Sequence, residues 1–226
     1  MLFSDRSDAG RRLARRLQRL HGEEAVVLGL PRGGVPVAFE VAEALDAPLD
    51  VIVVRKLPVP SQPELGMGAI GEAGVRILNE GIVQQAHVSA RELAGIEAVE
   101  RAELDRQVEL YRGDRPRAPL TGRTAVVIDD GIATGATAWA ACRVARLLGA
   151  RSVVMAVPVA PPRWTAELRD AADQMICLDT PAPFYCIGGW YQDFTQVTDA
   201  EVAGYLARRA AGSGGAVPPS PLPRAS

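Results

Sequence analysis

The 226-residue chain has few of the residues from which covalent or metal-bound frameworks are built. Its three cysteines, Cys142, Cys177 and Cys186, are too few and too scattered for a disulfide framework or a tetrahedral zinc site. No apolar run approaches the roughly 20 residues that a membrane-spanning helix needs. The N-terminus turns arginine-rich rather than apolar, unlike a secretory signal. These absences predict a cytoplasmic protein without a membrane partner.

An excess of charge of one sign is also missing. Lys and Arg number 25 and Asp and Glu 27, so the net charge is -2 and the pI about 5.8. No global positive field therefore favours nucleic acid as a partner. Five arginines form a basic face on the first predicted helix, namely Arg11, Arg12, Arg15, Arg16 and Arg19. We interpret this face as solvated surface, with a modest indication of an acidic partner.

The composition is otherwise that of a folded protein, with 48% hydrophobic and 23% charged residues. The length predicts a single domain, over residues 1–211. Residues 212–226 consist largely of small residues and prolines, which predicts a disordered tail.

Apolar, β-branched runs alternate with segments of helical periodicity, which indicates an α/β fold with a twisted parallel sheet flanked by helices. The predicted strands are 25–30, 49–54, 124–128, 152–159 and 175–178. The predicted helices are 7–20, 35–45, 89–112, 138–148 and 198–211, of which the third and the last begin with capping boxes. Residues 55–68, with three prolines and no periodicity, are predicted as a long mobile loop, and 69–78 as a short hairpin.

The strand at 124–128 ends in two adjacent carboxylates, Asp129 and Asp130, and a loop of small residues then leads into a helix. Ligands of open α/β sheets bind beyond the carboxyl ends of strands. Backbone N–H groups of this loop, with the hydroxyls of Thr134 and Thr137, can point at one anion in front of the helix. Paired carboxylates would repel a triphosphate but accept hydrogen bonds from a ribose diol. The segment therefore predicts a sugar phosphate site, and the alternative is an ordinary turn capped by aspartates.

The order Asp-Asp-x-x-x-Thr-Gly-x-Thr resembles the phosphoribosyl-diphosphate signature of type I phosphoribosyltransferases. The resemblance covers about Leu28 to Phe194 and is nearest to a subgroup of predicted phosphoribosyltransferases that share the stretches LPRGGVPVA and RKLPVPSQPELGMGAIGE. It implies that Asp129 and Asp130 hold the 2- and 3-hydroxyls of the ribose. It also implies a 5-phosphate site made of Ile132, Ala133, Thr134, Gly135, Ala136 and Thr137.

A second strand-to-helix turn, Pro31-Arg32-Gly33-Gly34, follows the strand at 25–30 and can bind an anion for the same reason. The resemblance makes Arg32, Gly33 and Gly34 the pyrophosphate site, and it implies a cis peptide bond between Pro31 and Arg32. The alternative is a Gly-Gly pair that only lets the helix pack closely on the strand.

The predicted loop at 55–68 corresponds to the family's mobile lid. By this resemblance Arg55 and Lys56 neutralise charge that develops on the pyrophosphate when the lid closes. The alternative is a solvated basic pair at the end of a strand.

Aromatic residues are few, 11 in all, and five of them fall within 184–194. In the family this region, here about 180–198, is a small C-terminal hood that stacks on the base. We expect base contacts from Tyr185, Ile187, Trp190 and Asp193, and the alternative is that the rings fill the local core or a dimer contact. Ala133 stands where 6-oxopurine enzymes carry an Asp, as in adenine- or uracil-type loops, so the base is not identified.

These residues predict an enzyme that transfers the ribose 5-phosphate group of phosphoribosyl diphosphate to a nitrogenous base, or the reverse, with release of pyrophosphate. The resemblance also implies a homodimer and Mg²⁺, held mainly by pyrophosphate and ribose oxygens rather than by protein ligands alone. Two alternatives remain open. One is a non-catalytic protein of the same fold that binds phosphoribosyl diphosphate or a nucleotide and regulates a partner, and the other is a hydrolase with Asp129 as nucleophile.

Overall fold

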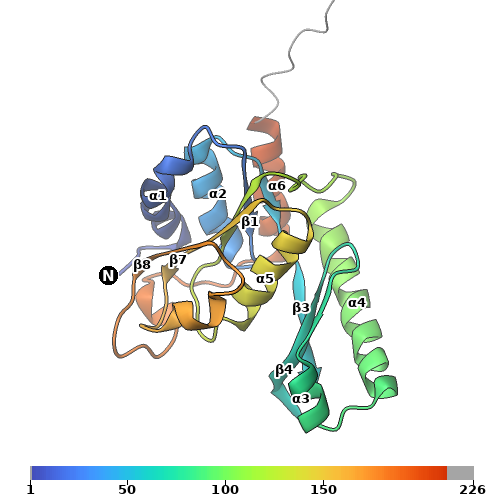
Figure 1. The fold of residues 1–226 in the computed structure, drawn as a ribbon. Coiled ribbons are helices and arrows are strands. Elements are labelled where there is room, and N and C mark those ends of the chain that lie inside the picture. The colour runs from blue at the N-terminus through green and yellow to red at the C-terminus, as the bar shows by residue number, and fades with distance from the viewer. Residues whose placement is uncertain (1, 213–226) are drawn as a thin grey trace, which may run out of the picture.

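The computed structural model describes residues 2–212. A five-stranded parallel sheet forms the centre of the fold (Figure 1). In spatial order its strands are β2 (Leu49–Val51), β1 (Ala25–Gly29), β6 (Thr124–Ile128), β7 (Ser152–Val159) and β8 (Gln174–Asp179). All four neighbouring pairs are parallel. The predicted α/β fold is confirmed. The order of the strands reverses between β1 and β6, because β2 lies on one side of β1 and the later strands on the other.

One face of this sheet is covered by α1 (Arg6–Leu17) and α2 (Gly34–Leu45). Alternate residues of a strand point to opposite faces, and Val27 of β1 and Ile128 of β6 belong to the cluster on this side. A short 3-10 turn, η1 (Gln18–Leu20), ends the first helix. The apolar stripe of α1 therefore faces the sheet, and Arg11, Arg15 and Arg16 lie on the outer side.

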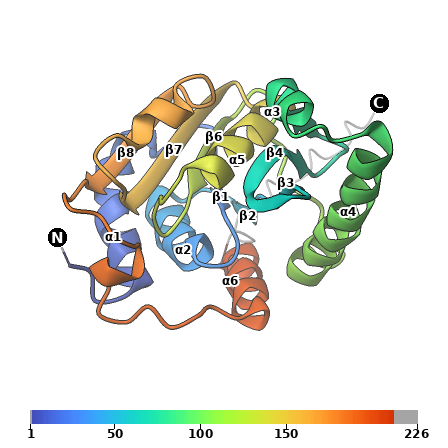
Figure 2. The same ribbon diagram turned by 90° about the horizontal axis from the view of Figure 1, so that it is seen from below.

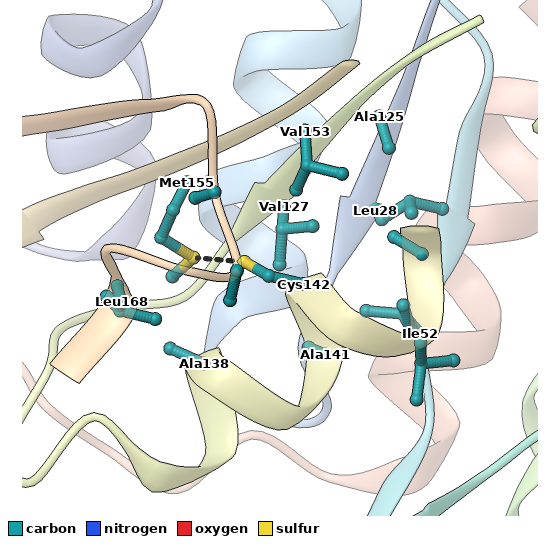
Figure 3. Close-up of a cluster of buried hydrophobic side chains, with 14 of the residues drawn as sticks. Leu28, Ile52, Ala125, Val127, Ala138, Ala141, Cys142, Val153, Met155 and Leu168 are labelled. Atoms are coloured by element: carbon teal, nitrogen blue, oxygen red, sulfur yellow. Dashed lines mark hydrogen bonds between the residues drawn. The ribbon is translucent and has the colours of Figure 1, made fainter. Parts of the chain in front are cut away.

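The opposite face is covered by α5 (Ala136–Leu147) and the 3-10 turn η2 (Trp164–Leu168). Figure 3 shows part of this cluster, in which side chains of α5 and of three strands interdigitate. The thiol of Cys142 lies 3.9 Å from the sulfur of Met155, and burial raises the pKa of this thiol to about 12. Cys142 is thus a buried apolar residue.

A second, antiparallel sheet contains β3 (Val54–Val59), β4 (Gln62–Gly71) and β5 (Arg76–Leu78), in that order. The prediction of a loop at 55–68 is therefore wrong, while the hairpin at 69–78 is confirmed. Prolines suggested a loop, but they occur where a ladder tolerates them. Pro58 lies on the edge strand β3 at a register irregularity, and Pro63 lies near the start of β4, before the part that pairs with β5.

Three further helices complete the fold: α3 (Glu80–Gln85), α4 (Ala90–Arg112) and α6 (Asp199–Gly212). Helix α4 packs along the second sheet and also contacts α6 (Figure 2). Both predicted capping boxes are present, at the starts of α4 and α6. Helix α3 was not predicted. Its N-cap is Asn79, whose side-chain oxygen accepts a hydrogen bond from the Ile82 N–H.

A buried cluster of charges joins the two sheets. The Arg112 guanidinium, at the end of α4, binds Asp50 of β2 through Nε at 3.1 Å and Glu72, in the turn between β4 and β5, through Nη1 at 2.6 Å. All three side chains are buried. Asp50 also accepts the Ala118 N–H at 2.9 Å. Charges this deeply buried are tolerated only when paired, so the cluster fixes the second sheet against the first.

The N-terminal segment pairs with the region predicted as the hood. The Phe3 N–H donates to the Trp190 carbonyl at 2.9 Å, and the Gln192 N–H donates to the Phe3 carbonyl at 2.8 Å. This region is irregular apart from the 3-10 turn η3 (Gly188–Trp190), as predicted. The predicted tail lies, after Gly212, outside the described residues. None of the helices within residues 2–212 is long and apolar enough to cross a membrane.

Candidate functional site

The two predicted anion-binding turns lie side by side at the carboxyl end of the parallel sheet. Gly29 of β1 is opposite Ile128 of β6, so the turns that follow these strands meet. A Cβ atom on Gly33 would lie 2.0 Å from the Asp130 Oδ2 atom, and one on Gly34 would lie 2.6 Å from the Ile128 carbonyl oxygen. Both positions therefore require glycine. The strand order reverses here, which is where open α/β sheets bind ligands.

The first turn contains the cis peptide bond between Pro31 and Arg32 that was predicted. The Arg32 side chain is 40% exposed, and its Nη1 atom lies 3.9 Å from the Asp199 Oδ1 atom at the start of α6. The same oxygen accepts a hydrogen bond from the Tyr111 hydroxyl at 2.7 Å. Burial, followed by the bond to Asp199, raises the pKa of Tyr111. Arg32 is thus directed towards α6 in this structure.

The acid pair follows β6 directly. Asp130 is buried and Asp129 is partly buried, and the Asp130 N–H donates to the Asp129 Oδ1 atom at 2.8 Å. Burial raises the pKa of both carboxyls, and the charge of Asp130 raises that of Asp129 further. Two adjacent, desolvated carboxyls are costly unless other groups compensate them.

Arg6, the first residue of α1, supplies that compensation. Its Nε atom lies 2.8 Å from the Asp130 Oδ2 atom, and its Nη1 atom donates to the Thr195 carbonyl at 2.8 Å. The guanidinium stacks on the Phe194 ring, 3.9 Å from the ring centroid. The Tyr191 hydroxyl donates to the Asp130 carbonyl at 2.6 Å. The acid pair is therefore held from the N-terminal helix and from the hood together.

The predicted 5-phosphate loop connects the acid pair to α5. Gly135 has φ of +82°, a left-handed conformation that favours glycine, and α5 begins at the next residue. Thr134 just before the helix, and Ala136 and Thr137 in its first turn, are exposed. The Ile132 N–H, expected among the phosphate donors, donates instead to the Val159 carbonyl at 3.0 Å, and its side chain is buried. Ile132 therefore anchors the loop to the core.

A pocket of about 600 Å³ lies between this loop and the second sheet. Thr134 and Thr137 line it on one side, and Lys56 and Gly66 line it on the other. Arg55, next to Lys56 in β3, is paired instead with Glu100 of α4 at 2.7 Å. Alternation along a strand explains why these two neighbours separate. Only Lys56 of the predicted lid pair lines the pocket.

The hood lies directly over the acid loop. Ile187 packs closely on Gly131: a Cβ atom added to Gly131 would lie 2.6 Å from the Cγ2 atom of Ile187. Ile187 and Trp190 are partly buried against the core, whereas Tyr185 is 87% exposed. Asp193 accepts hydrogen bonds from the backbone and hydroxyl of Thr195, and these bonds lower the pKa of Asp193. Tyr185 is therefore the predicted base contact whose ring is most accessible.

Comparison with known proteins agrees with this geometry. A family model described as the phosphoribosyl transferase domain matches residues 5–188. The chain belongs to this phosphoribosyl transferase family. Two Mycobacterium tuberculosis proteins (strains CDC 1551 and H37Rv), both named "Putative phosphoribosyl transferase", are 58% identical to it over 207 residues, which is 92% of this chain. The chain spans about half, 47%, of their length.

A solved structure is similar over nearly the whole chain. The crystal structure of TT1426 from Thermus thermophilus is 43% identical, with a TM-score of 0.83, and the match covers 92% of this chain and 99% of that one. The predicted parallel sheet with its flanking helices is therefore a fold that this chain shares with TT1426.

Two residues at the candidate site were not predicted, Arg6 and Tyr191. We predicted a basic face on the first helix, but the arginines of that face lie away from the acid pair. Three of them, Arg15, Arg16 and Arg19, line a second pocket of about 440 Å³ beside β8. No local signal distinguishes Arg6 from them, because its partner Asp130 is 124 positions away.

Proposed function

We propose that this phosphoribosyl transferase moves the ribose 5-phosphate group of phosphoribosyl diphosphate to a nitrogenous base, or in the reverse direction, with pyrophosphate as the leaving group. The bond between the anomeric carbon and the pyrophosphate oxygen breaks, and a bond from that carbon to a base nitrogen forms. The chain spans about half of its curated relatives, so the proposal concerns this half.

The observation that carries the proposal is the contact between the two turns. Gly33 and Gly34 lie against Asp130 and Ile128 with no room for a Cβ atom, at the point where the strand order reverses. One ligand can therefore reach both turns. A sugar with a phosphate at one end, a diol in the middle and a pyrophosphate at C1 matches the order of phosphate loop, acid pair and glycine turn.

The residues also fit a magnesium ion. Carboxylate oxygens are the hard ligands that Mg²⁺ prefers, and it commonly takes one or two of them together with substrate phosphates and water. Within residues 2–212 no group of three or more His, Cys, Asp and Glu side chains could hold a metal by protein ligands alone. Arg6 binds the Oδ2 atom of Asp130, so we assign the magnesium contact to Asp129. The bound ion would neutralise charge on the leaving pyrophosphate.

The remaining groups supply position and charge. The exposed Thr134 and Thr137 suit the 5-phosphate, and the pocket they share with Lys56 allows its ammonium to approach the phosphates. The exposed ring of Tyr185 offers a flat surface to a heterocyclic base. Preorganised contacts of this kind lower the barrier mainly by orientation and electrostatics.

The test is pyrophosphate release from phosphoribosyl diphosphate and Mg²⁺ in the presence of a panel of purine and pyrimidine bases. We expect release that depends on one class of base and is lost in the double variant Asp129→Asn, Asp130→Asn. The matched control is Arg106→Gln, which removes an exposed ion pair with Glu103 on α4, far along the chain from the site. The proposal would be contradicted if pyrophosphate were released without a base, and at the same rate in the double variant and in the Arg106→Gln control.

One observation favours a second function, a non-catalytic regulatory protein of the same fold. Ala133 offers no acid or base at the position before Thr134, so the loop supplies ligand contacts without a proton donor. Calorimetric binding of phosphoribosyl diphosphate, with no pyrophosphate released for any base, would support this alternative.

A further inference from the structure

Three distant segments meet at the Asp130 side chain. It follows β6, the Arg6 side chain reaches it from α1, and the hood residues Tyr191, Phe194 and Thr195 surround the pair. The Arg6 and Asp130 side chains are each only 11% exposed. An arginine this deeply buried is not part of the solvated basic face of α1.

The position of Arg6 relates it to both ligand-binding turns. Its Nε atom would lie 3.3 Å from a Cβ atom on Gly33, so the guanidinium borders the glycine turn as well as the acid pair. Without it, Asp129 and Asp130 would present two adjacent carboxylates to a ligand that carries phosphates at both ends. With it, one positive charge lies beside the pair, and repulsion between the carboxylates and the ligand is reduced.

We propose that Arg6 is a positioning residue for the ribose diol, which holds the Asp130 carboxylate in the orientation that accepts the sugar hydroxyls. This inference rests on the proposed function, because it assumes that the acid pair binds ribose. The guanidinium binds one carboxylate oxygen, Oδ2, and thereby restrains the rotation of the group. Its second bond, to the Thr195 carbonyl, fixes the guanidinium itself. The hood is thus part of the ribose site.

The experiment compares two sugar phosphates that differ in one hydroxyl. Binding of ribose 5-phosphate, 2-deoxyribose 5-phosphate and inorganic phosphate is measured by calorimetry for the wild type, Arg6→Gln and Arg6→Lys. Inorganic phosphate reports on the anion-binding turns without a contribution from the sugar hydroxyls. The control is Arg12→Gln, because Arg12 also lies on α1, pairs with Asp8 at 2.7 Å and stacks on Phe3 of the same N-terminal segment.

We expect Arg6→Gln to weaken ribose 5-phosphate binding about ten- to a hundred-fold, the usual cost of lost charged hydrogen bonds. It should also remove most of the preference over the 2-deoxy sugar and leave phosphate binding within about two-fold. Arg6→Lys keeps the charge but lacks the planar fork, so it should lie between Arg6→Gln and the wild type. Arg12→Gln should keep the preference of the wild type.

Each other outcome decides against the inference. Wild-type affinity and preference in Arg6→Gln would overturn the positioning role and leave the proposed function intact. Failure of the wild type to bind ribose 5-phosphate would overturn both. Equal weakening of all three ligands, or an equal loss of preference in Arg12→Gln, would assign Arg6 to general stability of the N-terminal segment. If Arg6→Gln does not fold, Arg6→Lys decides, and an unchanged preference there would overturn the role.

Discussion

The pocket is bordered on one side by the loop that follows β6 and the start of α5, and on the other side by the antiparallel sheet, and the two sides offer different kinds of groups. The parallel sheet is covered by helices on both faces, so only the turns beyond the ends of its strands are open to a ligand. The antiparallel sheet packs one side on α4 and leaves residues of β3 and β4 along the pocket. A parallel sheet thus provides rigid turns at one edge, whereas an antiparallel sheet provides side chains along a face.

The largest effect is expected where the two sheets are joined. Arg112→Leu leaves Asp50 and Glu72 buried without their cation, so the free energy of unfolding should fall by about 3–5 kcal/mol. In a chain of this size the melting temperature should drop by on the order of 10 °C. Urea unfolding measures the change in the free energy of unfolding. Arg106→Leu, which removes an exposed pair on the same helix, should cost less than about 1 kcal/mol. Equal losses would show that the buried cluster does not join the sheets.

A smaller effect is expected at the rigid turns. Gly34→Ala places a methyl group 2.6 Å from the Ile128 carbonyl, and it should separate the two turns. We expect a loss of about 1–3 kcal/mol in stability and at least ten-fold weaker binding of ribose 5-phosphate. Gly95→Ala is the control, because nothing lies within 4 Å of its added Cβ atom in α4. It should stabilise the protein by about 0.5–1 kcal/mol. Undiminished binding in Gly34→Ala would refute the tight contact.

The smallest effect is expected on the antiparallel side, where Lys56 and Arg55 are compared. Lys56→Ala should raise the KM for phosphoribosyl diphosphate or lower kcat, by about ten-fold in kcat/KM, with stability within about 0.5 kcal/mol of the wild type. Arg55→Ala removes the partly buried pair with Glu100, so it should cost about 1 kcal/mol of stability and change kcat/KM less. If Arg55 proves the more important residue for kcat/KM, the assignment of faces is wrong.

The local structure of the segment that holds the acid pair and the predicted phosphate loop could be predicted because it depends on neighbours in the sequence. A buried strand, two carboxylates, a glycine with positive φ and a helix start follow one another within 124–137. The hairpin at 54–71 could not, because Pro58 and Pro63 lower the strand signal and only the pairing with β4 and β5 shows that they are tolerated. Arg6 could not either, because it resembles the exposed arginines that follow it.

By itself, the sequence determined where the buried strands of the parallel sheet lie and where two glycine-containing turns lead from a strand into a helix, because periodicity, capping and glycine conformation act over a few residues. Only the tertiary structure decided that the two turns share one site, that Lys56 and not Arg55 faces the pocket, and that Arg6 accompanies Asp130. Those outcomes depend on strand order and burial, which bring together residues far apart in the sequence, such as Arg6 and Asp130, 124 positions apart. Desolvation then makes each buried charge depend on a partner that no local pattern identifies.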